Sequence, residues 1–554
     1  MEFFQAPPEL ANQYHDDRIL KSYLKRVLPS EMLAAIEGDL ARLGERVVTD
    51  ILQMAQEAEA QEPVHIPYDA WGRRIDEIRT ARAWQDLDRV AAEEGIVAHG
   101  YLRQYGELSR LYQFAKLYLF HPSSAIYSCP LAMTDGAARL IELHGSEEMK
   151  QRAFKHLTSL DPKLFWTSGQ WMTERAGGSD VSGSTTIACP DDGQWRIYGE
   201  KWFTSATTSQ MAMTLARIEG DDKLSLFYLE LRNEQGELQN IQVKRLKDKL
   251  GTRALPTAEL NLTGTPATLV GERGKGVKTI ATLFNITRVY NACCAVGYMR
   301  RGLALAKNYA TKRKAFGKLL KDHGLHTETL AQLQVRFEAS FHLTFHAVKL
   351  LGKEECGTAS EIESQTLRLL IPLAKLFTGK ETSAVCNEVM ESFGGSGYVE
   401  DTGLPQLVRN AQVLSIWEGT TNVLSLDCLR AIKKDNAGSA FLQDTVLRLK
   451  GIIHSSLAEE KKHILSAIEE LKQTLSEAAP ADEENLTSSA RSLAMGLART
   501  YSAALMLEQA QWEMTSGESL TKIAVRRWIK MGLYEKELLS YQHRSDSTQL
   551  LYQK

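Results

Sequence analysis

The spacing of apolar residues predicts helices in the N-terminal part of the chain. From Met32 to Ala55, apolar side chains recur every three or four positions, the period that gives a helix one buried face. The same spacing runs through Arg110–Leu119 and Thr134–Ile141. We therefore expect an N-terminal helical domain over residues 1–162.

The pattern changes to short strands between residues 163 and 275. Runs rich in β-branched and aromatic residues alternate there with clusters of turn residues. The clearest runs are Thr185–Ala188, Trp195–Tyr198, Met211–Leu215 and Leu226–Leu229. Asp191-Asp192-Gly193, between the first two runs, predicts a hairpin turn. We expect a central β domain over residues 163–275.

Helical spacing returns after residue 275 and continues to the end of the chain. Thr279–Leu305, Leu330–Leu351 and Leu367–Met390 are long enough to span a helix bundle. The sequence therefore predicts a mainly α fold with a central β domain. We expect the bundle over residues 276–430 and a helical extension over residues 431–554.

Composition narrows the class of protein. The 554 residues carry a formal net charge of -3, which gives no general case for binding nucleic acid or an anionic membrane. No run of about 18 apolar residues argues for a transmembrane helix. The seven cysteines are odd in number and lack metal-ligand spacing, which indicates reduced thiols and no metal site. Without a signal, transit or peroxisomal motif, we expect a cytoplasmic protein, or a mitochondrial one if a precursor is processed.

One carboxylate has an uncommon sequence environment. Glu418 lies between Ile416-Trp417 and Gly419-Thr420. Apolar neighbours remove water from a carboxylate, which suits a general base that works near neutral pH. The same residues are also typical of the acidic first turn of a helix. The stretch alone leaves both interpretations open.

Four other stretches carry groups that bind phosphates or aromatic rings. Adjacent glycines in Met172–Val181 and Glu391–Tyr398 expose backbone N–H groups. Lys312–Lys318 gathers four cationic side chains that suit a pyrophosphate. Trp202 and Thr204 occupy alternate positions of a predicted strand, so we expect them to face one side and to cover an aromatic cofactor. Each stretch also has a structural explanation: a glycine turn, a helix C-cap, a lysine-rich helix end or a core tryptophan.

The order of these stretches is more specific than any one of them. Met-Thr-Glu-x-x-Gly-Gly-Ser-Asp, Lys-Trp-Phe-Thr, Arg-Lys-x-Phe-Gly-Lys, Gly-Gly-x-Gly-Tyr and Ile-Trp-Glu-Gly-Thr follow one another between residues 172 and 420. This series resembles the acyl-CoA dehydrogenase family of FAD flavoproteins. Tyr68–Arg74, Arg245–Gly251 and the long helical extension resemble its AidB-like branch, which includes longer animal homologues. The resemblance implies an N-terminal helical domain, a β-barrel or sandwich domain, a four-helix bundle and an extra helical extension.

The resemblance also implies roles for individual residues. Glu418 matches the family's catalytic base. The residues implied in FAD binding are Met172, Thr173, Gly178, Ser179, Trp202, Thr204, Arg313, Phe316, Glu391, Gly394, Gly395, Gly397, Thr420 and Asn422. The residues implied in substrate binding are Ser179, Asn285, Arg288, Trp417 and Gly419. Asn285 and Glu391 depart from the residues that are common in the family, an aspartate and a glutamine.

The function that follows is dehydrogenation of a medium- to long-chain fatty acyl-CoA to a trans-2-enoyl-CoA. An electron-transfer flavoprotein is the expected acceptor, and FAD sites that span subunits imply a homodimer or homotetramer. Two alternatives stay open: a flavoprotein that sequesters acyl-CoA with little turnover, and an AidB-like protein associated with DNA. Acidic and basic residues are about equal in number after residue 430, so we rank DNA binding last.

Overall fold

The computed structural model describes residues 4–478, 483–518, 520–534 and 541–552. The chain divides into two compact units. The first unit contains Met1–Asp39, Tyr105–Leu111 and Asn291–Lys554, and the second contains Leu40–Gln104 and Tyr112–Tyr290. The division into four domains that the sequence suggests stays a prediction.

The second unit combines helices with strands. Its helices are α3 (Asp50–Ala60), α4 (Arg82–Glu93), α5 (Ala98–Leu102), α7 (Ser128–His144) and the short α8 (Glu147–Met149) and α9 (Lys155–Leu157). Its strands are β1 (Val64–Tyr68), β2 (Arg74–Arg79), β3 (Ser168–Trp171), β4 (Ile187–Asp191), β5 (Gln194–Ser205), β6 (Met211–Ile218), β7 (Leu224–Glu230), β8 (Ile241–Leu246) and β9 (Thr257–Val270). Three helices continue from one unit into the other: α2 (Ser30–Arg46), α6 (Ser109–Phe120) and α10 (Gly276–Ala310).

The strands of the central domain close into a barrel. The pairing runs β6–β4–β5–β9–β7, and β7 pairs again with β6, while β3 joins β6 and β8 joins β9. Asp192 and Gly193 form the turn between β4 and β5, as the sequence predicts, and Asp191 pairs with Gln194. Closure leaves few unpaired strand edges and gives the domain an inside and an outside.

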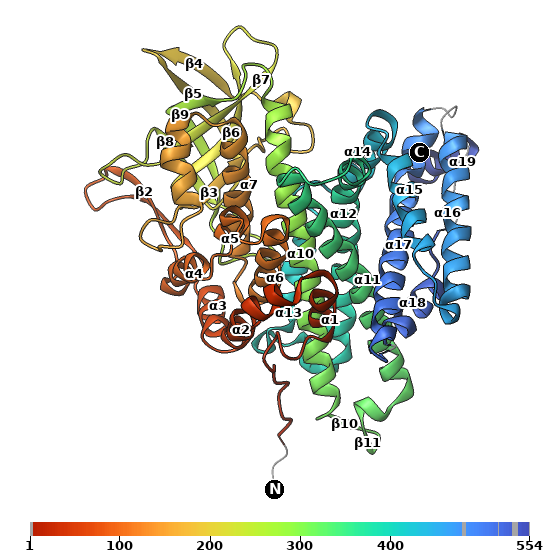
Figure 1. The fold of residues 1–554 in the computed structure, drawn as a ribbon. Helices are drawn as coiled ribbons and strands as arrows, with labels where there is room; N and C mark the ends of the chain where they lie inside the picture. The colour runs from red at the N-terminus through yellow and green to blue at the C-terminus, as the bar shows by residue number, and fades with distance from the viewer. Residues whose placement is uncertain (1–3, 479–482, 519, 535–540, 553–554) are drawn as a thin grey trace. The chain divides into compact units, whose positions relative to one another are not determined.

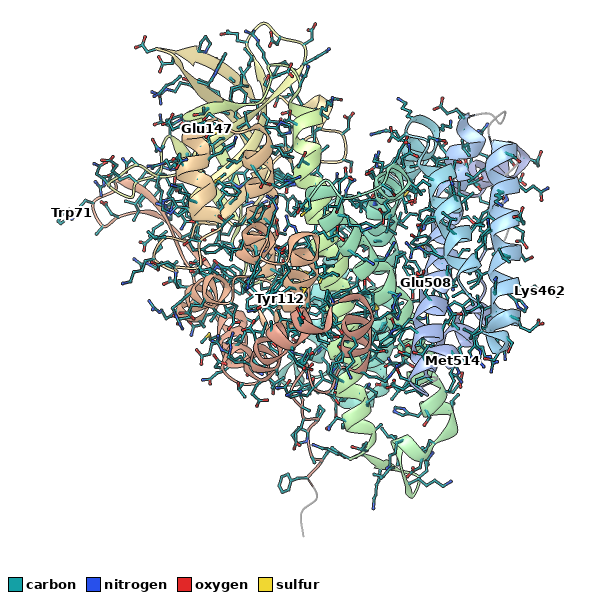
Figure 2. All side chains as sticks on the ribbon, in the orientation of Figure 1. Trp71, Tyr112, Glu147, Lys462, Glu508 and Met514 are labelled. Atoms are coloured by element: carbon teal, nitrogen blue, oxygen red, sulfur yellow. The ribbon has the colours of Figure 1, made fainter. Side chains whose placement is uncertain are left out.

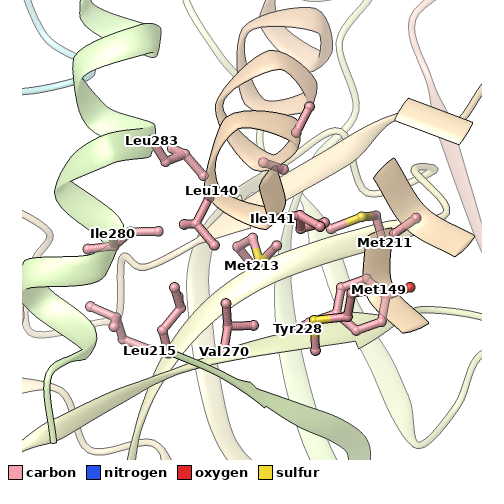
Figure 3. Close-up of a cluster of buried hydrophobic side chains, with 14 of the residues drawn as sticks. Leu140, Ile141, Met149, Met211, Met213, Leu215, Tyr228, Val270, Ile280 and Leu283 are labelled. Carbon is pink, nitrogen blue, oxygen red and sulfur yellow. The ribbon is translucent and has the colours of Figure 1, made fainter. Parts of the chain in front are cut away.

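Strand β6 shows why this sequence folds into a barrel covered by helices. Ala212, Ala216 and Ile218 point into the barrel core, while Met211, Met213 and Leu215 pack outside against residues of α7 and α10 (Figure 3). Both faces of the strand are therefore buried, and the run is apolar on both alternate sets of positions. Gly136 on α7 permits close approach to α10, because a Cβ there would lie 2.6 Å from the Leu283 side chain.

Among its described residues, the first unit is helical apart from one small hairpin. Its elements are α1 (Arg18–Val27), β10 (Lys314–Ala315), β11 (Lys318–Leu319), α11 (Gly324–Glu355), α12 (Glu361–Ser392), α13 (Leu404–Val413), α14 (Thr421–Lys434), α15 (Ala437–Lys450), α16 (Ala458–Ala478), α17 (Glu483–Thr515), α18 (Leu520–Lys530) and α19 (Tyr541–Tyr552). Helices α11, α12 and α17 pack against one another (Figure 1). Ser360 and Glu363 form a capping box that fixes the start of α12.

Buried polar contacts join the helical extension to the N-terminal helix α1. Glu513 of α17 is 1% exposed and accepts hydrogen bonds from Arg18 and Ser22 of α1 and from the backbone of Thr521 in α18. One carboxylate thus ties α17 and the following helix α18 to α1, near the other end of the chain. Loss of a partner from a buried charge is strongly destabilising, so these contacts favour this arrangement of the three helices.

Two hairpins differ from the sequence-based expectations. Tyr68–Asp76, within the domain expected to be helical, contains the turn between β1 and β2, where Trp71 is 94% exposed (Figure 2). Lys312–Lys318, expected as a helix end, follows the last residue of α10 and forms the β10–β11 hairpin. Both segments are short and polar, so their spacing carries no strand signal.

Within the described ranges, no helix has the length and apolar character needed to cross a membrane.

Candidate functional site

Glu418 lies in the turn between α13 and α14, in the first unit. Its side chain is half-buried and its backbone is left-handed, with a φ of 56°, followed by Gly419 with a φ of 103°. A left-handed conformation costs a glutamate on the order of 1–3 kcal/mol and persists only where surrounding contacts hold it. Helix α14 begins three residues later, at Thr421, so Glu418 belongs to the turn before the helix and not to its first turn.

Two buried side chains from other helices contact this turn. Asn291 of α10 donates a hydrogen bond to the Leu414 carbonyl over 2.9 Å and accepts one from the Trp417 indole. The amine of Lys375 on α12 donates to the Gly419 carbonyl over 2.6 Å. The sequence analysis identified neither residue, because both lie far from Glu418 in the chain and carry no motif.

The glycine-rich loop after β3 is a second candidate element, and it lies in the second unit. Met172 is buried and Thr173 is half-buried, whereas Gly178 and Ser179 are exposed. A Cβ at Gly178 would lie 2.5 Å from the Thr173 hydroxyl oxygen, so this approach needs glycine. The loop thus exposes its glycine backbone beside a threonine hydroxyl, which suits a hydrogen-bonding ring or an anion.

Glu174 anchors this loop to the barrel. Its carboxylate is 4% exposed and accepts hydrogen bonds from Lys201 over 2.9 Å, from the Thr185 backbone over 2.7 Å and from the hydroxyls of Ser184 and Thr186. Burial alone would raise the pKa of Glu174, but the Lys201 ammonium and these donors lower it to about 2. The carboxylate therefore stays ionised and holds the backbone that follows Thr173.

Trp202 and Thr204 lie on β5, beside the same loop. The Trp202 backbone N–H donates to the Thr173 carbonyl over 2.9 Å, which joins strand and loop. Thr204 is fully buried, and its hydroxyl donates to the Ala258 carbonyl over 2.6 Å. The pairing with β9 shifts between Lys201 and Thr204, so the strict alternation that placed both side chains on one face is interrupted there.

The β10–β11 hairpin presents Phe316 to the outside of the first unit. Phe316 and Gly317 form its two-residue turn, with φ angles of 48° and 79°. A left-handed phenylalanine is strained, and this one is 98% exposed. Arg313, just before the hairpin, donates to the Gln5 side chain over 3.3 Å. A strained, fully exposed aromatic ring fits a contact with another molecule better than a role in folding.

Two more expected elements lie at helix ends of the first unit. Glu391 is exposed near the C-terminal end of α12. Gly394, Gly395 and Gly397 form the short helical turn that follows. A Cβ at Gly397 would lie 2.0 Å from the Met390 carbonyl, whereas Gly395 has open space around it. Thr420 and Asn422, both exposed, stand at the N-terminus of α14, where backbone N–H groups favour a negative charge.

The expected substrate residues are divided between the units. Trp417 and Gly419 belong to the turn of Glu418 in the first unit. Ser179 lies on the glycine-rich loop, and Asn285 and Arg288 are half-buried on the part of α10 that belongs to the second unit. The described chain holds no group of three or more His, Cys, Asp or Glu side chains suited to a metal ion.

Each unit by itself offers groups of the kind that FAD binds. In the second unit, the loop after β3 has exposed amides and the Thr173 hydroxyl, which suit a flavin ring. In the first unit, the exposed glycine turn and the start of α14 suit phosphates. Gly178 and Gly397 are both positions where a Cβ would collide with neighbouring atoms. These two glycines are therefore required by the packing of the loops themselves.

Family models match four successive segments of the chain. They are the adaptive response protein AidB N-terminal domain over residues 5–161, the acyl-CoA dehydrogenase middle domain over 169–265, the acyl-CoA dehydrogenase C-terminal domain over 274–433, and the acyl-CoA dehydrogenase 11 C-terminal domain-like model over 437–552. The last match covers the helices that follow the bundle.

Whole-length relatives agree with these segments. Acyl-CoA dehydrogenase family member 11 of Caenorhabditis elegans is 42% identical over 95% of this chain and 88% of its own length. Putative acyl-CoA dehydrogenase AidB of Escherichia coli (strain K12) is 30% identical over 80% of this chain and 81% of its own.

Solved structures show the same fold. The structure of Caenorhabditis elegans ACDH-11 in complex with C11-CoA has a TM-score of 0.97 and 40% identity, with 100% of this chain and 97% of that chain covered. The apo form of Bd2924 has a TM-score of 0.86 and 52% identity, with 92% and 100% covered. The barrel, the helical bundle, the extension and the extent of these matches show that the chain belongs to the acyl-CoA dehydrogenase family, in the branch with an AidB-type N-terminal domain and a helical extension.

Proposed function

We propose that this protein binds FAD and dehydrogenates a medium- to long-chain fatty acyl-CoA to the trans-2-enoyl-CoA. Membership of a FAD-dependent family supports the cofactor. The complex of ACDH-11 with C11-CoA supports an acyl-CoA ligand of that length. The observation that carries the proposal is the strained Glu418, a half-buried carboxylate on a left-handed turn that other helices hold in place.

In this mechanism Glu418 removes a proton from the carbon next to the thioester carbonyl. The proton is weakly acidic, so the developing enolate oxygen needs hydrogen-bond donors, and the Glu418 backbone N–H is our candidate. A bound FAD would supply the acceptor for the hydride of the neighbouring carbon. Thr173, Gly178 and Trp202 are expected to hold the flavin ring.

The same proposal extends to the partners of the protein. Phe316 and Arg313 are expected to reach the FAD of a neighbouring subunit, whose adenine side would meet Gly394–Gly397. The 98% exposure of Phe316 supports such a subunit contact, and closed symmetry favours a dimer or tetramer. An electron-transfer flavoprotein is the proposed electron acceptor.

Anaerobic absorption spectra test this function. The purified protein is reconstituted with FAD and titrated with saturated acyl-CoAs of increasing chain length. We expect the flavin bands to bleach with medium and long chains in the wild type and in Glu388→Gln, an exposed control on α12. Glu418→Gln should keep its flavin and its acyl-CoA affinity but fail to bleach.

Two results would contradict the proposal in different ways. Flavin that stays oxidised in the wild type, together with tight and chain-dependent binding of acyl-CoA, would identify a sequestering protein. A protein that takes up no FAD would remove the cofactor and the reaction together. An unchanged rate of bleaching in Glu418→Gln would show that another group is the base.

A further inference from the structure

The turn that carries Glu418 is held by side chains that lie outside the Ile-Trp-Glu-Gly-Thr motif. It extends from Leu414, directly after α13, to Gly419, directly before the N-cap of α14. Two side chains of other helices that hydrogen-bond this turn are Asn291 and Lys375, which lie 127 and 43 positions before Glu418 in the sequence. Both residues belong to the first unit, as does the whole turn.

Asn291 joins Leu414 and Trp417 in the first part of the turn. Its amide nitrogen donates to the Leu414 carbonyl over 2.9 Å, and its amide oxygen accepts from the Trp417 indole N–H. Asn291 is 3% exposed, so water does not compete for these bonds. The residue that directly precedes Glu418 therefore has a fixed side chain and a fixed backbone direction.

Helix α12 contacts the turn at both of its ends. Lys375 is fully buried, and its amine donates to the Gly419 carbonyl over 2.6 Å. Gly379 lies one helical turn further on, and a Cβ there would be 2.6 Å from the Leu414 carbonyl oxygen. The missing side chain at Gly379 allows the start of the turn to rest on the helix, and Lys375 secures its end.

These contacts account for the strained backbone at Glu418. Residues held in the left-handed region need surroundings that determine their conformation. Here the side chain of Trp417, directly before Glu418, is held by Asn291, and the Gly419 carbonyl, one peptide beyond Glu418, is held by Lys375. The direction in which the Glu418 side chain leaves the backbone is therefore set by α10 and α12.

We propose that Asn291 and Lys375 are positioning residues for the base, with Lys375 holding the Gly419 carbonyl on one side of Glu418 and Asn291 holding Leu414 and the Trp417 side chain on the other. The inference rests on the proposed function, in which Glu418 removes the substrate proton. A misplacement of about 1 Å in a reacting group can cost on the order of 100-fold in rate. Loss of either contact should therefore slow proton removal while leaving acyl-CoA binding almost intact.

The test measures proton removal and flavin reduction in the same FAD-loaded protein. Lys375→Met removes the donor at similar length, and Lys375→Arg restores a buried donor. Asn291→Asp keeps an acceptor for Trp417 but loses the donor to Leu414, and Asn291→Leu loses both. Lys462→Met, an exposed lysine on α16 (Figure 2), is the matched control. Stopped-flow reduction by a C11-CoA substrate and exchange of its α-protons in D2O are the two readouts.

We expect Lys375→Met and Asn291→Leu to slow both readouts by roughly 100-fold, with less than a threefold change in the acyl-CoA dissociation constant. Lys375→Arg and Asn291→Asp should recover part of the loss, and Lys462→Met should match the wild type. Flavin content and thermal unfolding, measured on each variant, separate a misplaced base from a misfolded protein.

The outcomes separate this proposal from the proposed function. If Glu418→Gln is slow while Lys375→Met and Asn291→Leu reduce flavin at the wild-type rate, the positioning role is wrong and the base assignment stands. If Glu418→Gln itself keeps the wild-type rate of exchange, the proposed function fails first. Slowing that follows only the loss of bound flavin or of folded protein also overturns the positioning role.

Discussion

Replacing Glu174 by glutamine should destabilise the barrel and loosen the flavin loop. Glu174 follows Thr173 directly, and its carboxylate joins the loop to Lys201 on β5 and to the segment before β4. The substitution keeps the size of the side chain and some of its hydrogen bonds. It removes the negative charge that faces the fully buried Lys201 ammonium.

The size of the effect follows from the pKa of Glu174. Folding lowers this pKa from 4.5 to about 2. At about 1.4 kcal/mol for each pKa unit, the ionised carboxylate stabilises the folded state by roughly 3 kcal/mol at pH 7. Burial lowers the pKa of Lys201, so an ammonium left without Glu174 adds its own cost. A loss of at least about 3 kcal/mol is therefore expected.

The sign of the pH dependence gives a second check. Because the folded pKa is below the unfolded one, the unfolded chain binds the proton more tightly. The stabilisation is complete well above pH 4.5 and is lost as the pH falls from 4.5 toward 2. The difference between wild type and Glu174→Gln should therefore shrink over this range.

Urea unfolding followed by tryptophan fluorescence measures these differences, since Trp171 and Trp202 lie close to the network. The double variant Glu174→Gln/Lys201→Met removes both charges and should recover most of the lost stability. Flavin content after gel filtration reports on the loop. Equal urea midpoints for wild type and Glu174→Gln at pH 7, or no recovery in the double variant, would refute the reasoning.

Three other predictions follow from single residues. Burial lowers the pKa of His342 to about 3, so the folded protein loses stability as the pH falls from 6.5 toward 3. His342→Leu should therefore raise the Tm relative to wild type at pH 5 but not at pH 8. Gly397→Ala should lower the Tm by several degrees because a Cβ would meet the Met390 carbonyl, whereas Gly395→Ala should leave it unchanged, and equal Tm values would exclude that collision. Phe316→Ser should lower the assembled fraction in light scattering and keep the fold, and unchanged assembly would place Phe316 outside the subunit contact.

The sequence predicted the parts of the fold that depend on local periodicity. The long helices α10, α11 and α12 have apolar residues at helical spacing and cover the stretches expected for them. The mainly α fold with a central β domain is confirmed by the barrel and by the matched family models. The turn at Asp192-Gly193 was also predictable, because glycine and aspartate adopt left-handed conformations at low cost.

The sequence did not predict elements whose residues carry no periodic signal. Strands β10 and β11 have two residues each, and their turn places Phe316 in a conformation that phenylalanine rarely adopts. The sequence predicts regular alternation along β5 at Trp202 and Thr204. The shift in pairing after Lys201 depends on how β9 pairs with this strand. Pairing of this kind joins residues about sixty positions apart, which a local pattern does not encode.

The same limit applies to the candidate site, and it explains what a motif can and cannot provide. Ile-Trp-Glu-Gly-Thr contains the carboxylate and the glycine that lets the chain turn, so the sequence finds the group that reacts. We propose that the direction of that group depends on Asn291 and Lys375. A local pattern passes over them because each bonds a backbone carbonyl, although Asn291 also accepts from the Trp417 indole. Every residue has a backbone carbonyl, so a contact with a carbonyl does not require a particular residue type there. Such a contact therefore leaves no pattern in the sequence that links the two positions. A protein that keeps the motif but loses either residue should therefore keep a glutamate in the right place along the chain and present it in the wrong direction.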